Sequence, residues 1–311
     1  MPVFVENTDW KPDGPTVVSV GAFDGIHAGH QSILRKLTTE QKSLHAESLL
    51  FTFDPHPKKV LFPEKEVRLL TVKPEKKDIL RNFDLDYVLF YPFNRDFARM
   101  TGEEFLAFLK SHYRIKKLIL GFNHVFGSDR LADDNLIRKL ARKYGFEVER
   151  MPAVKVNGIV VSSTEIKKRL RNYDVKTANM LLGYEYMMYG MVREGSKFGR
   201  KIGYPTANLH PLSDDKFIPP DGVYAVYVHR ESRKIGGVMN IGTRPTVDGS
   251  RRLIEVHLFD FKGDLYDELL KVHIVDFIRP EQRFPSVEAL QQQIARDIIA
   301  AKIKLKKTIK D

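Results

Sequence analysis

One stretch near the start of the chain decides the fold of its first half: Thr16-Val17-Val18-Ser19-Val20-Gly21-Ala22-Phe23-Asp24-Gly25-Ile26-His27-Ala28-Gly29-His30. Its first five residues form a short apolar run, as in a buried parallel strand. Two glycines then allow a tight turn, and Ile33, Leu37 and Leu44 share one face of the helix that follows. The pattern predicts a strand, a turn and a helix, from which parallel sheets are built.

Similar apolar runs recur through the first half, at residues 48–53, 87–91, 118–120 and 146–151. Helical patterns lie between them, and Thr101 with Glu104 forms a capping box that opens one of these helices. The dipeptide Asn157-Gly158 predicts a two-residue hairpin turn. Alternating strands and helices predict an α/β domain with a doubly wound parallel sheet.

After Gly183 the pattern changes to strands separated by Gly- and Pro-rich turns, with no helix between them. The predicted strands cover residues 187–192, 222–229, 235–241, 253–261 and 271–277. This spacing is typical of a small antiparallel β-barrel or sandwich. A terminal helix is predicted after Ser286, with Leu290, Ile294 and Ile298 on its apolar face. We therefore expect two domains, residues 1–183 and residues 184–311.

Composition narrows the class of protein. The chain has 51 Lys and Arg against 40 Asp and Glu, a formal net charge of +11, and no cysteine. The missing cysteines exclude disulfides, thiolate zinc sites and cysteine nucleophiles, and they fit a reducing compartment. We see no signal peptide and no membrane-spanning apolar run, so we expect a cytoplasmic protein without a membrane partner. The positive charge favours a polyanionic partner, either a nucleic acid or phosphorylated small molecules.

The turn that ends in His27 and His30 is the first candidate site. A strand–turn–helix junction offers backbone N–H groups to a phosphate, and two histidines three residues apart can face one ligand. The arrangement suits nucleotide triphosphate binding, with the imidazoles at the α-phosphate. A zinc pair and incidental polar histidines are the alternatives. The stretch is neither a Walker A loop nor a dinucleotide-binding glycine motif.

The second candidate site is the stretch from Gly190 to Asn208. Three glycines spaced by four residues and the charges of Lys197, Arg200 and Lys201 make a natural phosphate cradle. Thr206 and Asn208 point the same way in an extended segment, and their oxygens suit Mg²⁺ together with ATP phosphates. A flexible turn with solvated basic residues is the alternative.

These motifs resemble those of bacterial bifunctional riboflavin kinase/FAD synthetases. The histidine turn is similar to the HxGH signature of nucleotidylyltransferases, and three further motifs of that module match at residues 53–57, 120–127 and 162–167. Residues 205–208, 222–225, 239–246, 254–261 and 278–284 resemble the riboflavin kinase module. The resemblance implies a Rossmann-like nucleotidylyltransferase domain followed by a riboflavin kinase barrel with a terminal helix.

For the first half, the resemblance implies an FMN adenylyltransferase in which FMN attacks the α-phosphate of MgATP and pyrophosphate leaves. His27 and His30 would stabilise the developing charge. The implied ATP-binding residues are Gly21, Phe23, Asp24, Gly29, Asn123, Ser163, Thr164 and Lys167. The implied flavin-binding residues are Asp54, His56 and Pro57, although His56 also fits rigid turn chemistry.

For the second half, the resemblance implies a riboflavin kinase in which the riboflavin 5′-hydroxyl attacks the γ-phosphate of ATP. Glu255 would be the general base, with a solvent-facing strand residue as the alternative, and Thr206 and Asn208 would place Mg²⁺. The implied phosphate-binding residues are Gly195, Ser196, Lys197, Gly199, Arg200 and Gly203.

The expected partners are therefore riboflavin, FMN and ATP, with FAD as the final product, in a monomer or weak homo-oligomer. Two rival interpretations remain at this point. Many family members have Arg where Lys167 stands, so the kinase could be the only active module. The net charge alone also allows a nucleic-acid-binding protein, although zinc-finger spacing and basic runs laced with aromatics are missing.

Overall fold

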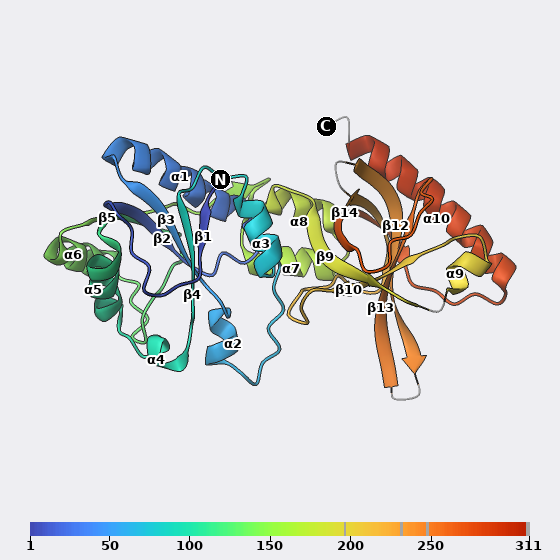
Figure 1. Ribbon diagram of the computed structural model, residues 1–311, viewed down its shortest axis with the longest axis horizontal. Helices are drawn as coiled ribbons and strands as arrows, with labels where there is room; N and C mark the ends of the chain where they lie inside the picture. The colour runs from blue at the N-terminus through green and yellow to red at the C-terminus, as the bar shows by residue number, and fades with distance from the viewer. Residues whose placement is uncertain (196, 231–232, 247–248, 309–311) are drawn as a thin grey trace. The chain divides into compact units, whose positions relative to one another are not determined.

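The computed structural model describes residues 1–195, 197–230, 233–246 and 249–308 of the 311-residue chain. By its internal contacts the chain divides into two compact units (Figure 1). The first unit comprises Met1–Leu69 and Lys76–Ser162, and the second comprises Leu70–Glu75 and Ser163–Asp311. Neither unit is therefore one continuous stretch of the chain.

The first unit is built on a six-stranded sheet whose neighbouring strands are all parallel, in the order β1-β4-β3-β2-β5-β6. The chain proceeds from β2 to β4 on one side and then crosses to β5 and β6 on the other, so the topological switch point lies between β2 and β5. The predicted doubly wound sheet is confirmed, and β1 is an edge strand that the sequence did not predict. The strands are β1 (Val3–Val5), β2 (Thr16–Val20), β3 (Glu47–Phe53), β4 (Tyr87–Tyr91), β5 (Ile115–Leu120) and β6 (Glu147–Arg150).

Helices cover the sheet of the first unit. Helix α1 packs against β2, β3 and β5, while α5 and α6 contribute Phe105, Leu109 and Ile137 to a core with Val18 and Phe51 of the sheet. The predicted capping box is confirmed at the start of α5. The helices of this part of the chain are α1 (Ala28–Leu44), α2 (Pro57–Leu61), α3 (Lys73–Leu80), α4 (Arg95–Ala98), α5 (Gly102–Tyr113) and α6 (Asp134–Tyr144).

A small hairpin formed by β7 (Lys155–Val156) and β8 (Ile159–Val160) follows the sheet. Asn157 and Gly158 both have positive φ angles, of 50° and 78°. Two positive φ angles in a row are what the tight hairpin turn requires, and Asn-Gly is the dipeptide that adopts them most readily. The hairpin prediction is confirmed.

The second unit contains a closed antiparallel barrel in the order β10-β13-β12-β11-β14-β9, with β9 also paired to β10. Alternate residues such as Ile254 and Val256 are buried inside it, and Glu255 between them faces outward. The predicted barrel is confirmed, and β10 is a strand that the sequence did not predict. The strands are β9 (Tyr186–Arg193), β10 (Ala207–Pro211), β11 (Gly222–Arg230), β12 (Arg233–Thr246), β13 (Gly249–Leu258) and β14 (Leu269–Pro280).

Four helices of the described chain accompany the barrel: α7 (Ser163–Arg171), α8 (Val175–Leu182), α9 (Phe198–Lys201) and α10 (Val287–Thr308). The short helix α9 corrects the expectation that no helix lies between the strands. Its single turn follows Lys197, which takes a left-handed conformation. Helix α8 is capped by Asp174 and ends at Gly183. Within the described part of the chain, no helix has both the length and the apolar character to cross a membrane.

The terminal helix α10 packs on β11, β12 and β14 (Figure 1). The hydroxyl of Tyr227 donates to the Leu305 carbonyl oxygen at 2.9 Å. Asp297, which is only 3% exposed, accepts from the Arg279 guanidinium at 2.8 Å. A buried carboxylate must be paired. Arg279 of the motif at 278–284 therefore has a structural role, as the partner of Asp297.

A short segment from the first half of the chain, Leu70–Glu75, belongs to the second unit. The carboxylate of Glu75 accepts from the Lys216 ammonium at 2.7 Å and from the Tyr189 backbone N–H at 2.9 Å, and both charged side chains are at most 1% exposed. Lys216 also donates to the carbonyl oxygens of Leu70 and Met187. A fully hydrogen-bonded buried ion pair therefore ties this segment to β9 and the loop around residue 216.

Candidate active sites

The histidine turn lies at the carboxyl end of β2, at the switch point where open α/β sheets bind ligands. Phe23, Gly25 and Ile26 all have positive φ angles, of 46°, 87° and 36°. Non-glycine residues adopt this conformation at a cost, so such turns persist where the surrounding structure holds them, and they cluster at functional sites. Phe23 is 3% exposed and Asp24 is 6% exposed, so the turn is packed into the unit.

The two histidine rings are stacked. Their centroids are 3.6 Å apart, with an interplanar angle of 12°. His27 is the N-cap of α1, and its Nδ1 accepts a hydrogen bond from the backbone N–H of His30 at 3.2 Å. Gly29 lies against the His27 ring, because a Cβ there would come within 3.3 Å of it. The structure therefore places the two predicted rings side by side, and one of the N–H groups expected to bind phosphate is already bonded to His27.

Burial keeps both imidazoles neutral. It lowers the pKa of His27 to about 4, although the Asp24 carboxylate acts in the opposite direction. Burial also lowers the pKa of His30 to well below its ordinary value, and the nearby His27 and Lys76 add to this effect. His30 Nδ1 has no hydrogen-bond partner among the described residues. No group of three or more His, Cys, Asp or Glu side chains suited to a metal ion occurs among these residues, so the zinc alternative gains no support.

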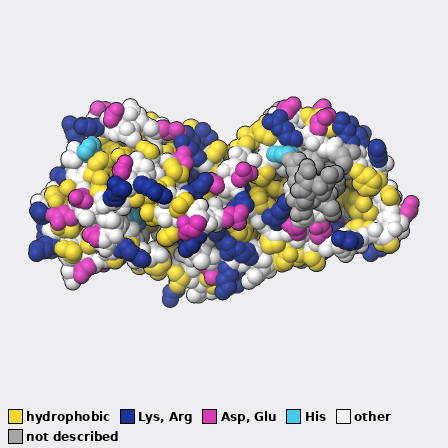
Figure 2. Space-filling model, turned by 90° about the horizontal axis from the view of Figure 1, so that it is seen from below, with side chains coloured by type: hydrophobic (Ala, Val, Ile, Leu, Met, Phe, Trp, Pro, Cys, Tyr) yellow, Lys and Arg dark blue, Asp and Glu magenta, His cyan; other side chains and the backbone are white. Residues whose placement is uncertain are grey.

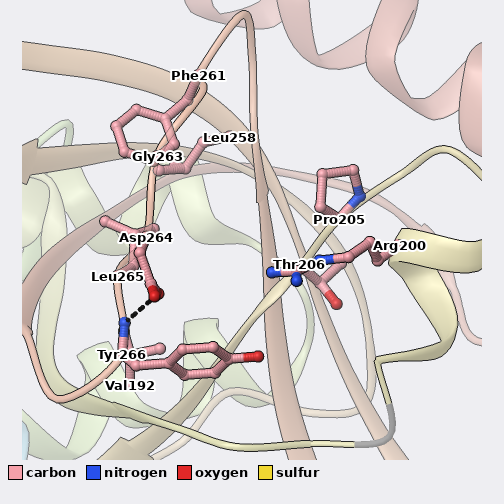
Figure 3. Close-up of a pocket in the computed structure, with 10 residues that line it drawn as sticks. All are labelled: Val192, Arg200, Pro205, Thr206, Leu258, Phe261, Gly263, Asp264, Leu265 and Tyr266. Atoms are coloured by element: carbon pink, nitrogen blue, oxygen red, sulfur yellow. Dashed lines mark hydrogen bonds between the residues drawn. The ribbon is translucent and has the colours of Figure 1, made fainter.

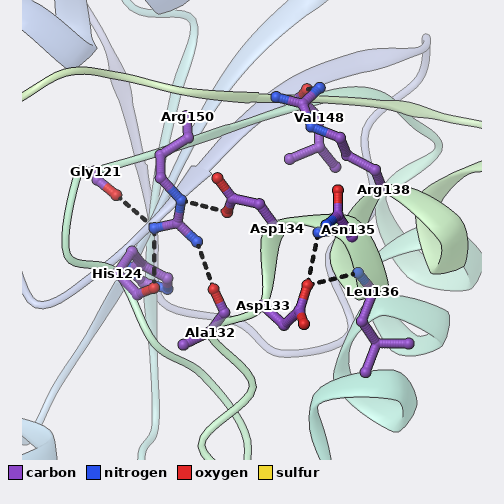
Figure 4. Close-up of polar contacts among 10 residues, drawn as sticks. All are labelled: Gly121, His124, Ala132, Asp133, Asp134, Asn135, Leu136, Arg138, Val148 and Arg150. Carbon is purple, nitrogen blue, oxygen red and sulfur yellow. Dashed lines mark hydrogen bonds and ion pairs between the residues drawn. The ribbon is translucent and has the colours of Figure 1, made fainter.

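The loop after β5 is held by one arginine (Figure 4). Arg150, at the end of β6, donates to the carbonyl oxygens of Gly121, His124 and Ala132 at 2.9, 3.1 and 3.5 Å. Its Nε also pairs with Asp134 at 2.6 Å. Because β5 adjoins β2, this loop lies on the other side of the switch point from the histidine turn. Asn123 of this loop is exposed.

An apolar cavity of about 290 Å³ lies at the same edge of the sheet. It takes in the last residues of β2 and β3, Val20 and Phe53, and the side chain of His124. Burial, assisted by the charge of Arg150, lowers the pKa of His124 to about 4, and its Nε2 has no partner among the described residues. The remaining lining residues are Pro57, Leu61, Phe93, Phe97, Ala98, Met100, Phe105, Val125, Phe126, Gly127, Ser128 and Arg130.

The other residues predicted for the first half occupy separate places. Pro57 lines the apolar cavity, and His56 is the N-cap of α2, where its Nδ1 accepts from the Lys58 N–H at 3.1 Å. Asp54 follows β3, and its backbone N–H donates to Tyr91. Gly21 approaches the Phe23 ring so closely that a Cβ would come within 3.1 Å. Ser163, Thr164 and Lys167 lie on the first turns of α7 in the second unit.

The glycine-rich loop of the second unit folds against the predicted metal ligands. A methyl group on Gly195 would overlap with the Asn208 amide, and one on Gly199 would overlap with the Tyr204 carbonyl oxygen and come within 3.2 Å of Thr206 Oγ1. Only glycine allows this close approach of the backbone. Ser196 lies outside the described residues. Lys197 forms an ion pair with Glu194 at 2.9 Å, which the sequence did not predict.

A polar row crosses the outer face of the barrel next to this loop. Asn208 of β10 is directly opposite Glu255 of β13, which in turn is directly opposite Asn240 of β12. Directly opposed residues of antiparallel strands project to the same face. The structure therefore brings together the predicted site residues Asn208 and Glu255 and places Asn240 beside them. The Nδ1 of the neighbouring His257 donates to the Pro205 carbonyl oxygen, 2.8 Å away.

Arg200 and Thr206 line a cavity of about 70 Å³ beside the loop after β13 (Figure 3). Tyr266 and Asp264 close its far side, where the Tyr266 N–H donates to the Asp264 carboxylate at 3.0 Å. Gly203, the last glycine of the loop, has a φ of 83° and open space where a Cβ would stand. Apart from Ser196, the residues predicted around the phosphates of the kinase thus lie on one loop, and Asn208 lies on the strand that follows it.

Sequence reasoning missed four polar residues of these sites: Lys76, His124, Arg150 and Asn240. His124 lies inside a motif that was quoted, and no role was assigned to it. Lys76 stands in a charged stretch, but its spacing from the buried Ile79 and Leu80 puts it on the inner face of α3. That helical spacing was the available signal.

Charge is spread over the molecule. On the face shown in Figure 2, basic and acidic side chains are interspersed over both units. Several bases are paired: Lys117 lies 2.9 Å from Glu40 and 2.7 Å from Glu149, and Lys36 contacts the same two carboxylates. Much of the positive charge is therefore structural or solvated surface.

Comparisons with known proteins cover both units. The chain matches the family model of FAD synthetase over residues 10–165 and that of riboflavin kinase over residues 182–305. A solved structure described as a macrolide-efflux protein from Streptococcus pneumoniae is 32% identical, with a TM-score of 0.87, and the match covers 97% of this chain and 98% of that one.

Curated relatives match along nearly the whole chain. The bifunctional riboflavin kinase/FMN adenylyltransferase of Escherichia coli (strain K12) is 37% identical over 300 residues, which cover 96% of this chain and 95% of the relative. The protein of the same name from Haemophilus influenzae is 35% identical over 287 residues and 92% of both chains. With both family models matched in order and both folds present, the chain belongs to the bifunctional riboflavin kinase/FMN adenylyltransferase family.

Proposed function

We propose that this chain makes FAD from riboflavin in two steps. The barrel unit transfers the γ-phosphoryl group of ATP to riboflavin, which gives FMN and ADP. The sheet unit then transfers AMP from a second ATP to FMN, which gives FAD and pyrophosphate. One observation supports the proposal: each unit has a loop whose backbone packs tightly beside a set of polar side chains. In the first unit it is the histidine turn after β2, and in the second it is the glycine loop before β10. We assign adenylyl transfer to residues 1–183 and phosphorylation to residues 184–311.

In adenylyl transfer, the chain's contribution is positioning and charge stabilisation. His27 and His30 are stacked and neutral, so each ring has an N–H to donate toward the α-phosphate as negative charge develops there. Asn123, in the loop held by Arg150 across the switch point, would hold ATP. The further proposed ATP contacts are Gly21, Phe23, Asp24, Gly29, Ser163, Thr164 and Lys167.

The apolar cavity is the proposed place for the flavin ring of FMN. Its lining is mostly apolar and aromatic, with Pro57 at its side and His124, Ser128 and Arg130 as polar residues. Flat heteroaromatic ligands bind in pockets of this composition, where a few polar groups set the orientation. Asp54 and His56, next to Pro57 in the chain, are proposed to contact the flavin as well.

In the kinase step, Glu255 is the proposed general base. Its register opposite Asn208 puts a carboxylate beside the loop that would hold ATP, so it could take the proton of the riboflavin 5′-hydroxyl as that oxygen attacks phosphorus. Gly195, Ser196, Lys197, Gly199, Arg200 and Gly203 would surround the phosphates. Ser196 enters this proposal from the family resemblance alone.

Thr206 and Asn208 fit a magnesium ion. Their hydroxyl and amide oxygens are hard ligands, and the backbone at Gly195 and Gly199, on the loop proposed to bind the phosphates, packs closely beside them. Mg²⁺ commonly takes one or two protein oxygens and completes its shell with phosphates and water. When bound, the ion would neutralise charge on the β- and γ-phosphates of ATP.

Purified protein supplied with riboflavin and MgATP tests the proposal by chromatography of the flavins. FMN should appear first and FAD second. Supplying FMN as the sole acceptor isolates the second step, so a single active module would give only one product. Failure of both products would overturn the function. Tight, steeply salt-dependent DNA binding would favour the nucleic-acid alternative. A monomer or weak oligomer in the cytoplasm remains our prediction for the assembly and location.

A further inference from the structure

Lys76 is a charged side chain buried inside the first unit. It lies on α3 and is only 6% exposed. A lysine is almost never fully buried unless other groups compensate its charge, because removing an ammonium group from water is costly. The groups that surround this lysine therefore indicate why it is there.

The lysine ammonium reaches the histidine turn. Its Nζ donates to the carbonyl oxygen of Ala22 at 2.6 Å and lies 3.5 Å from the hydroxyl of Thr52. That hydroxyl also donates to the Ala22 carbonyl at 3.3 Å. Two donors from two different elements, α3 and β3, thus converge on one peptide oxygen. This peptide directly precedes the three residues with positive φ that carry the chain to His27.

The charges around Lys76 also belong to this turn. Burial lowers the pKa of Lys76 to about 8, and the carboxylates of Asp24 and Asp54 act in the opposite direction. In turn, the Lys76 charge helps to hold the pKa of His30 down, after burial and His27. The facing titratable groups are therefore two carboxylates and the stacked histidines, and the ammonium is the cation among them.

We propose that Lys76 is a positioning residue for adenylyl transfer: it fixes the Ala22 peptide so that the turn presents His27 and His30 to the nucleotide. This rests on the adenylyltransferase proposed above. Lys76 acts through the turn and is not a catalytic residue. The inference goes beyond the histidine motif, because the lysine lies on a different helix, 46 residues after His30 in the chain.

Lys76→Met and Lys77→Met form a matched pair for the test. Lys77 is the next residue, but its ammonium is partly exposed and pairs with Glu6 at 2.6 Å. We expect Lys76→Met to lower kcat for FAD formation from FMN by about 30-fold or more, since small misplacements of reacting groups cost about 100-fold. FMN formation in the same protein should change by less than about 2-fold, since it uses the other unit. Lys77→Met should leave both rates near those of the unmodified chain.

The pH dependence of FAD formation shows whether Lys76 acts through its charge or only by filling space. If the ammonium form holds the turn, FAD formation by the unmodified chain should fall above a pH of about 8, and this fall should be missing in Lys76→Met. Lys76→Arg, which keeps the charge with a different shape, should recover part of the rate. Thermal midpoints of all variants are measured alongside.

A rate of FAD formation within about 2-fold of normal in Lys76→Met would overturn the role of Lys76. Equal losses in Lys76→Met and Lys77→Met would overturn it as well. If Lys76→Met does not fold, Thr52→Val removes the other donor to Ala22, and an unchanged rate together with a flat pH profile of the unmodified chain would count against the proposal. No FAD from the unmodified chain would instead overturn the adenylyltransferase itself.

Discussion

The Nδ1 of His27 accepts the backbone N–H of His30 at 3.2 Å while the two imidazole rings stack 3.6 Å apart. One histidine therefore both starts helix α1 and faces the site, and this bond places the single N–H proton of its neutral ring on Nε2. In α-phosphate chemistry the useful part of the ring is the Nε2–H group. The capping and binding roles of His27 can be separated because they use different nitrogens.

Replacing His27 tests that separation. His27→Asn keeps a side chain that caps helices well, whereas His27→Ala removes cap and ring together. Both variants should lower FAD formation from FMN by about 100-fold or more, the loss typical of one donor to developing charge. Only His27→Ala should also lose about 1 kcal/mol of stability. Flavin chromatography and urea unfolding measure the two effects, and a normal FAD rate in either variant would contradict the proposed role.

Replacing Glu255 should produce the opposite pattern. Glu255→Gln keeps the shape of the side chain but cannot take a proton, so riboflavin phosphorylation should fall by about 100-fold or more. FAD should still form when FMN is supplied. Asp260→Asn is the control, because Asp260 is an exposed carboxylate in the loop after β13. Phosphorylation that survives in Glu255→Gln would assign the base elsewhere.

The glycines of the barrel loop should differ in their tolerance of alanine. At Gly195 an added methyl group overlaps with the Asn208 amide, so Gly195→Ala should displace this ligand and raise KM for MgATP by about 10-fold. At Gly203 there is open space for a methyl group. Gly203→Ala should therefore lose only the free energy that a positive φ costs a non-glycine residue, about 1 kcal/mol. Steady-state kinetics at varied MgATP distinguishes the two. Equal kinetic defects would show that backbone strain, and not contact with Asn208, sets the requirement.

Acid should destabilise the first unit. His27 and His124 have pKa values of about 4 in the folded unit against 6.5 ordinarily. Between these values the unfolded chain binds more protons than the folded chain, so the free energy of unfolding falls as the pH falls below 6.5. Each pKa unit corresponds to about 1.4 kcal/mol. Trp10, the one tryptophan of the chain, packs against this core and reports its unfolding by fluorescence.

The control for the acid effect is His124→Phe, which removes one titrating ring and keeps an aromatic side chain in the cavity. Its urea midpoint should depend less on pH between 7.5 and 5 than that of the unmodified chain. A midpoint that does not move over this range in the unmodified chain would mean that the histidines are not buried as described.

The buried pair of Lys216 and Glu75 should be asymmetric under mutation. Lys216→Met leaves a buried carboxylate without its counter-charge, so it should lower the stability of the second unit by about 3–5 kcal/mol. Adding Glu75→Gln should recover much of this loss, because no charge is then left buried alone. Circular dichroism of urea unfolding measures both. A double variant as unstable as the single one would show that the other hydrogen bonds of Lys216 matter more than the pair.

The sequence could predict those features that residues close together in the chain decide, and it missed those that depend on residues far apart in the chain. The Asn157-Gly158 turn and the Thr101–Glu104 capping box were predicted because neighbouring residues decide them. The strands β1 and β10 were missed because pairing partners far along the chain make them strands: β1 pairs with β4, and β10 with β9 and β13.

The same distinction holds for the sites. The histidine turn and the glycine loop are continuous in sequence, so their residues were found together. Lys76, Arg150 and Asn240 reach these loops from other elements, and only the fold brings them there. Residue types alone could not separate Lys76 from its partly exposed neighbour Lys77, since the two differ in burial.

The pairing of Glu75 with Lys216, 141 residues apart, sets an order of events during synthesis. A nascent chain emerges with Glu75 long before Lys216 exists, so this carboxylate cannot meet its counter-charge until residue 216 has left the ribosome. For the protein engineer the same fact means that no single cut of the gene yields two intact halves. A barrel expressed from residue 163 onward would need residues 70–75 supplied as a grafted or separate peptide.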